Sequence, residues 1–248
     1  MDAMALHGSA PHTYSQWLTS ADDEGYWSFR DIALVVGLTL YGLSMALMVR
    51  ANLGLDPWDV LHQALSVQSG ASMGAVTAVV GALVLLAWIP LKLKPGIGTV
   101  VNVVIIAVVV DAGLGAIEPP ASPMSRAAML LGGLALNAAA TVLYIGADMG
   151  AGPRDGLMTG LVARTGRPVW LVRTSIEGTV LTVGWLLGGS VGLGTLVYAF
   201  GIGPLVQLVL RLVPGRVLAR SGWALTLREQ AAVLEASRVV EQAVVERV

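Results

Sequence analysis

The chain has 248 residues, of which 55% are hydrophobic and 12% are charged, and its mean hydropathy is +0.74. Soluble domains carry about 25% charged residues, so this composition predicts a protein that crosses a membrane several times. The net charge of −1, without a basic patch interleaved with aromatic residues, argues against nucleic acid as a partner. Because cysteine is absent and two of the three histidines fall in the polar first 29 residues, we expect no metal and no cofactor.

The elements expected along the chain are all α-helical. Residues 1–29 form a polar tail without the pattern of a cleavable signal peptide. Each apolar stretch that follows is close to the roughly 20 residues that a spanning helix needs, and lipid cannot satisfy an open backbone. Residues 221–248 have apolar residues at helical spacing among charges, which predicts a cytoplasmic amphipathic helix. The six predicted spans are 31–49, 72–90, 98–116, 127–147, 168–187 and 193–213.

A motif that follows the first apolar stretch returns after the fourth. Its members recur at an offset of 96 positions (from 54 to 150): Gly54, Pro57 and Asp59 return as Gly150, Pro153 and Asp155. A Gly-x-Gly-Thr segment at 96–99 returns at the same offset as 192–195. Backbone geometry places such glycines and prolines, so their repetition is informative even in an apolar chain. We interpret the chain as two copies of one unit, 30–117 and 127–213.

Each unit carries a short helix after its first span. Asp56 can cap a helix start, Pro57 suits the first helical position, and Asp59 stands where a capping box has its acidic residue. The predicted helices cover residues 57–68 and 153–165. About 12 residues make about 18 Å of helix, too short to cross a core of about 30 Å. The short helices are therefore interfacial or re-entrant; if they crossed instead, the two units would be parallel.

The distribution of positive charge predicts the topology. With six crossings, Arg50 and Arg126 fall on one side of the membrane. The other side receives most of the basic residues, so both termini are expected in the cytoplasm. Since each unit crosses three times, the units should be inverted relative to one another, giving a 3+3 repeat. The basic residues on the cytoplasmic side are Arg30, Lys92, Lys94, Arg154, Arg164, Arg167, Arg211, Arg216 and Arg220.

Polar residues inside the predicted spans are candidates for a substrate or ion path. Glu177 lies near the middle of the fifth span, with Arg173 four residues earlier on the same face. A carboxylate at that depth costs about 2.5 kcal/mol or more, which marks either a functional site or an internal ion pair. Asp111 is a candidate proton or ion carboxylate, or a helix-to-helix hydrogen-bonding group. Asn102 and Asn137 are more typical of contacts between helices.

The paired aspartates of the motif allow two interpretations. Asp59 and Asp155 can satisfy the free N–H groups of their own helix starts, as aspartate does in any protein. They can also line a path, since paired short helices in two halves of a transporter point to its site. Carboxylates at both helix starts favour a cation or a neutral polar solute, whereas Arg50 and Arg154 leave the sign of the charge open.

The segment Arg50-Ala51-Asn52-Leu53-Gly54-Leu55-Asp56-Pro57-Trp58-Asp59-Val60-Leu61 resembles the hallmark of the bacterial YczE-type membrane proteins, and so does Gly96-Ile97-Gly98-Thr99-Val100-Val101-Asn102 with Asp111. The resemblance covers about residues 31–215 and implies a multi-pass protein of the bacterial inner membrane. In the second unit Arg154 replaces Trp58 and Tyr198 replaces Asn102, so the two copies are not expected to act identically.

Three classes of function follow from these features. A secondary transporter for a small solute accounts for the inverted repeat, the paired short helices and the intramembrane charges. A non-transporting scaffold that holds a cytoplasmic partner through 221–248 is the alternative. An enzyme is not expected, because no histidine falls inside a predicted span to build a triad. The partners expected are the lipid bilayer and a small solute, and faces of small residues allow a homodimer.

Overall fold

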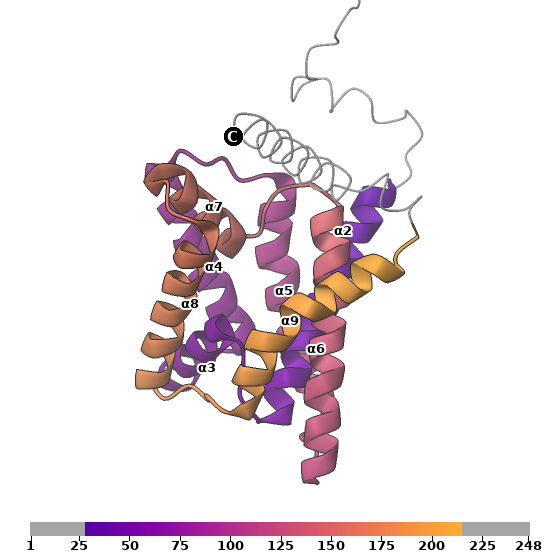
Figure 1. Ribbon diagram of the computed structural model, residues 1–248. Coiled ribbons are helices and arrows are strands. Elements are labelled where there is room, and N and C mark those ends of the chain that lie inside the picture. The colour runs from indigo at the N-terminus through magenta and orange to yellow at the C-terminus, as the bar shows by residue number, and fades with distance from the viewer. Residues whose placement is uncertain (1–27, 215–248) are drawn as a thin grey trace, which may run out of the picture.

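The computed structural model describes residues 28–214, and all of the regular secondary structure in that range is α-helical (Figure 1). The predicted tail, apart from its last two residues, and the predicted helix at 221–248 lie outside the described residues. Ser28 caps the first described helix, which begins at Phe29 rather than at residue 31. The helices are α2 (Phe29–Ala51), α3 (Pro57–Ser69), α4 (Met73–Leu91), α5 (Ile97–Ala116), α6 (Pro123–Gly146), α7 (Pro153–Thr165), α8 (Val169–Leu186) and α9 (Leu193–Leu212).

The helices recur with the offset seen in the sequence. Helices α3 and α7 have corresponding first and last residues, and so do α5 and α9. Each short helix begins with proline and ends before a glycine with positive φ, 71° at Gly70 and 63° at Gly166. Such a left-handed residue stops a helix at low cost only when it is glycine. The same start and stop signals therefore produce the same element twice.

Five described helices are long and apolar enough to span a membrane, namely α2, α4, α5, α6 and α9. The predicted fifth span corresponds to α8, which is 18 residues long and is not among the five. Arg173 and Glu177 lower its apolar character. The molecule is thus a bundle of apolar helices with two short helices, α3 and α7, that cannot cross a bilayer by length.

Helices α2 and α6 pack closely against one another. They run antiparallel, and α3 and α7 lie at opposite ends of the molecule (Figure 1). Small residues permit the close approach of the two helices: a Cβ atom on Gly37 would lie 2.7 Å from the backbone nitrogen of Tyr144. Asn137 donates to the Ser44 hydroxyl at 2.9 Å and accepts from Tyr198 at 3.3 Å. The prediction that Asn137 joins helices is confirmed.

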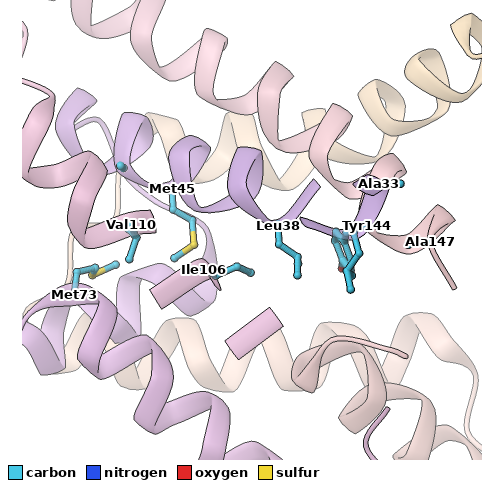
Figure 2. Close-up of a cluster of buried hydrophobic side chains, with 10 residues drawn as sticks. Ala33, Leu38, Met45, Met73, Ile106, Val110, Tyr144 and Ala147 are labelled. Atoms are coloured by element: carbon cyan, nitrogen blue, oxygen red, sulfur yellow. The ribbon is translucent and has the colours of Figure 1, made fainter. Parts of the chain in front are cut away.

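The largest apolar core lies where α2 meets α5 and α6. Figure 2 shows Leu38, Met45, Ile106 and Val110 within it, together with Tyr144. Leu38, Met45 and Val110 have no exposed surface. This core fixes the positions of α2, α5 and α6, whereas the short helices α3 and α7 pack chiefly against α8 and α4.

Two equivalent hydrogen bonds join the halves. The Gly98 N–H donates to the Met149 carbonyl at 2.9 Å, and the Gly194 N–H donates to the Leu53 carbonyl at 2.7 Å. The loops that accept these bonds turn at Gly54 and Gly150, with φ values of 110° and 122°. In each case the Gly-x-Gly-Thr segment of one half packs on the loop of the other, as its small residues predict.

Candidate functional site

Although α3 and α7 lie toward opposite ends of the molecule, their first turns meet inside the bundle. Asp56 caps α3: its Oδ1 accepts from the backbone nitrogens of Trp58 and Asp59, at 2.9 Å each. The predicted cap and the predicted Pro57 start are confirmed. The corresponding cap of α7 is Gly152, which has no side chain to offer. The start of α7 therefore lacks the carboxylate that completes α3.

Arg154 of α7 reaches the carboxylates of α3. Its guanidinium lies 3.4 Å from Asp59 Oδ1 and 3.9 Å from Asp56 Oδ1. It also stacks over the Trp58 ring, 5.1 Å from the ring centroid. Trp58 and Arg154 occupy the same position in the two copies, so the repeat brings one position into contact with its own counterpart. The sequence interpretation of Asp59 as a capping residue is wrong, because its Oδ1 bonds to Arg154.

His62, one turn after Asp59, belongs to the same buried group. Its Nδ1 lies 3.4 Å from Asp59 Oδ1 and 3.3 Å from the Thr77 hydroxyl. Its Nε2 is buried and has no hydrogen-bond partner among the described residues. A second oxygen on each of Asp56 and Asp59 is also buried without a partner. Unpartnered buried groups of this kind are uncommon and call for an explanation.

Burial is the largest cause of the shifted pKa values of these groups, which lie outside the five apolar spans. It raises the pKa of the Asp56 carboxyl to about 7, with Asp59 adding to the rise and Arg154 opposing it. It raises the pKa of Asp59 as well, against the guanidinium of Arg154. Burial, together with the charge of Arg154, lowers the pKa of His62 to about 3. His62 is therefore a neutral imidazole at pH 7.

A cavity of about 90 Å³ lies beside this group, between α2, α3, α4, α5, α6 and α7. One probe-sized site for a water takes roughly 10–15 Å³ on this measure, so the cavity holds a few waters or a small solute. Apolar residues of α4 and α5 form one wall. The polar and aromatic lining consists of Tyr41, Trp58, His62, Thr77, Asn102, Tyr144, Arg154 and Asp155.

Asp155 presents its carboxylate to the cavity. The Tyr144 hydroxyl donates to Asp155 Oδ2 at 2.8 Å, and the ring of Tyr144 meets that of Tyr41 edge to face, 5.9 Å between centroids. Asn102 also lies near Gly152: its Nδ2 would be 3.6 Å from a Cβ atom placed there, and Asp155 Oδ2 would be 3.3 Å from the same Cβ atom. A carboxylate and an amide thus lie close to the start of α7.

The structure places the other candidate residues elsewhere. Asp111 accepts from the Ser72 hydroxyl at 2.5 Å and from the Gly74 N–H at 2.7 Å, so it holds the start of α4. Arg173 pairs with Glu177 at 2.9 Å, with side chains 57% and 38% exposed. Of the four residues predicted for a substrate or ion path, Asn102 alone lines the cavity.

Of the repeated motif, Pro153 and Asp155 line the cavity and Asp59 lies directly behind it. Gly54 and Gly150 serve the turns that join the halves, and Pro57 starts α3. Sequence reasoning missed Tyr41, Tyr144 and His62. Of these three, His62 alone could have been found from the sequence, because it directly follows the repeated motif.

Comparisons with known proteins find relatives over most of the chain. The model of a family of unknown function, DUF6198, matches residues 29–211. A Bacillus subtilis (strain 168) protein with the name "Uncharacterized membrane protein YczE" is 32% identical over 187 residues, 75% of this chain and 83% of its own length. The chain belongs to the YczE-type family. An "Uncharacterized protein" of Haemophilus influenzae is 38% identical over 180 residues, 73% of this chain and 83% of its own length.

The YczE-type family thus includes a protein described as a membrane protein, and the apolar helices described above agree with a multi-pass membrane location. No solved structure matches the chain significantly. The family match covers all eight described helices apart from the last residue of α9, so both copies of the unit belong to it.

Proposed function

We propose that this protein is a secondary transporter for a small solute, with six spans arranged as a 3+3 inverted repeat in the inner membrane. One observation carries the proposal. The starts of two short, equivalent helices meet at a buried polar group beside a cavity, and residues of both halves line that cavity. Paired broken or short helices in the two halves of a transporter characteristically end at its transport site.

The arrangement of the helices supports the inverted repeat. Helices α2 and α6 are equivalent and antiparallel, α3 and α7 lie at opposite ends, and the described chain starts and finishes at the same end (Figure 1). The bonds from Gly98 to Met149 and from Gly194 to Leu53 are exchanged between halves, as a two-fold relation between the halves requires. With α8 as the sixth span, both termini fall on one side, which the positive charges assign to the cytoplasm.

A difference between the halves supports alternating access. Helix α4 packs along α5, where a Cβ atom on Gly74 would collide with the Ala107 carbonyl oxygen. Their counterparts α8 and α9 are apart: Trp170, equivalent to Gly74, is 67% exposed, and a Cβ atom on Gly203, equivalent to Ala107, would meet nothing within 4 Å. Two halves that hold different packings can exchange them and thereby expose a central site to alternate sides.

Flux through reconstituted vesicles tests the proposal. The full-length protein is placed in proteoliposomes, and uptake of labelled sodium, methylammonium and acetate is measured side by side. We expect saturable uptake of at least one solute, its loss in Asp155→Asn, and its retention in Glu118→Gln, the same change at an exposed carboxylate outside the cavity. Uptake that is equal in vesicles with and without protein, across this panel, contradicts the proposal.

A scaffold that holds a cytoplasmic partner through residues 221–248 is the second candidate. Deleting those residues separates the two functions. A transporter retains its flux after the deletion, whereas a scaffold loses a co-purifying partner and shows no flux in either form.

A further inference from the structure

The polar group around the cavity carries more carboxylates than cations. Asp56, Asp59 and Asp155 face a single arginine, Arg154, and His62 is the remaining ionisable imidazole. Arg154 is already held by Asp56 and Asp59 and covered by the Trp58 ring, and it forms no salt bridge to Asp155. Even with one proton shared by the two carboxylates of α3, two negative charges oppose one positive charge.

Asp155 is the carboxylate left for another partner. Within residues 28–214 its hydrogen-bond partner is the Tyr144 hydroxyl, a neutral donor. Asp155 is partly buried, and a carboxylate withdrawn from water is unfavourable unless a cation or several donors compensate it. The amide of Asn102, which also lies near Gly152, makes no hydrogen bond to any described residue and lines the same cavity. Both groups are thus available to one ligand.

His62 provides an independent sign of a ligand. Its side chain is 1% exposed, it lines the cavity, and its Nε2 has no partner among the described residues. Three groups lie near its Nδ1: the Asp59 carboxylate at 3.4 Å, the Thr77 hydroxyl at 3.3 Å and the Arg154 guanidinium at 3.4 Å. The Thr77 hydroxyl donates to the Met73 carbonyl, so Asp59 and Thr77 both offer acceptors to a proton on Nδ1, and Nε2 is then an acceptor. The carboxylate of Asp155, the amide of Asn102 and the imidazole of His62 all line the cavity, and each of these groups has lone pairs. Because the guanidinium of Arg154 is held by the carboxylates of α3, this set suits a cation better than an anion.

The size of the cavity and the charge of its lining indicate which cations it can hold. A cavity of about 90 Å³ admits a small ion with some water, or an ion the size of methylammonium. In the part of the chain that the structure describes, no group of three His, Asp or Glu side chains has the arrangement of a metal site. A divalent ion, which needs several anionic oxygens, therefore fits poorly.

We propose that the cavity binds a small monovalent cation, with the carboxylate of Asp155 as its counter-charge and Asn102 and His62 as neutral ligands. The inference deepens the proposed transport function, because it names the class of substrate or coupling ion at that site. The arginine then acts inside the protein: it neutralises the carboxylates of α3 and leaves Asp155 for the cation.

Equilibrium binding to the purified, full-length protein in detergent tests this inference. Trp58 lines the cavity, so tryptophan fluorescence reports occupancy and thermal unfolding reports stabilisation. Sodium, potassium and methylammonium chlorides are titrated at constant ionic strength against the bulky cation N-methylglucamine. Acetate and sulfate are titrated with N-methylglucamine as their counter-ion. Wild type and Glu118→Gln should respond saturably to at least one small cation and to neither anion.

The variants assign the response to the site. Asp155→Asn should weaken the apparent affinity by about tenfold or more, because a charged partner is lost. Asn102→Ala keeps every charge and should weaken the apparent affinity less. This variant replaces Asp155→Asn as the test of the site if Asp155→Asn does not fold. The inference is overturned by a saturable response to an anion, by no saturable response to any of the three cations, or by a cation response that both variants retain. Binding without flux would contradict the transport proposal and leave this inference standing.

Discussion

One position of the repeat holds tryptophan in the first copy and arginine in the second. Because the copies meet at this position, Arg154 stacks on its own counterpart Trp58. Two tryptophans there would leave Asp56 and Asp59 without a cation, and two arginines would place a second charge in the interior. The divergence of one repeated residue thus allows a charged group to be buried between two similar halves.

Removing the arginine charge should be costly. Arg154→Met leaves two buried carboxylates without a cation, so we expect a loss of about 3–5 kcal/mol in unfolding free energy. Thermal unfolding in detergent measures the loss. Arg167→Met, at an exposed position whose guanidinium makes no recorded contact, should change stability by less than about 0.5 kcal/mol. Equal stability of the two variants would show that Arg154 does not neutralise α3.

Asp111 should prove structural. Asp111→Asn weakens the bonds to Ser72 and Gly74, and we expect it to lower stability by about 1–3 kcal/mol, since bonds to a charged group are lost. The cation titration should be unchanged, because Asp111 does not line the cavity. Loss of cation binding with unchanged stability would contradict this and would show that Asp111 belongs to the ion path.

Residues with a local role could be predicted from the sequence, and those with a distant partner could not. Asp56 and Pro57 act within one helical turn, so their roles as cap and first residue were readable. Asp59 looked like part of the same cap, but its partner is 95 residues away. The sequence around Asp59 contains no pattern that predicts a partner so distant in the chain.

At the scale of elements, the short helices were predictable to within a residue. Residues 153–165 match α7, and 57–68 fall one residue short of α3. Proline at the start and glycine after the end fix these bounds through backbone geometry alone. Length and apolar character likewise located the long helices. The packing of α8 was not predictable, because Arg173 and Glu177 satisfy each other within the helix and so reveal nothing of its neighbours.

Equivalent helix crossings in the two halves are packed with residues of different size. Where α4 crosses α7, Trp88 lies against Gly156, and a Cβ atom on that glycine would collide with the ring. At the equivalent crossing of α8 with α3, Gly184 lies against the backbone of Val60 and Leu61. Trp88 corresponds to Gly184 and Gly156 to Val60. Each of these two crossings thus contains a glycine, which lies on α7 in the first and on α8 in the second.

This exchange predicts a compensating pair of substitutions. Gly156→Val should prevent normal docking of α7, because its side chain meets Trp88. Trp88→Gly should leave a void and cost about 3–5 kcal/mol. The double variant reproduces the packing of the other half, so its loss should be smaller than the sum of the single losses by at least about 1 kcal/mol. Thermal unfolding of the four proteins measures this; strictly additive losses would show that the two crossings are not equivalent.

At the scale of the whole molecule, the sequence predicted a repeat, and the structure reveals where its halves touch. The offset of 96 positions followed from the motif, and the charges indicated the inversion. The meeting of the two short helices could not be inferred, since it depends on how far each enters the bundle. That depth is set by the contacts of α3 with α8 and of α4 with α7, which involve residues distant in sequence.

The central claim is that the two halves are inverted in the membrane, and cysteine labelling tests it most directly. The chain has no native cysteine, so Val67→Cys near the end of α3 and Ala163→Cys at the equivalent position of α7 report without background. Both positions are exposed. In intact cells an impermeant maleimide should label residue 67 from outside, and residue 163 only after the membrane is opened. Labelling of both positions from the same side would contradict the inverted repeat and the transport site built on it.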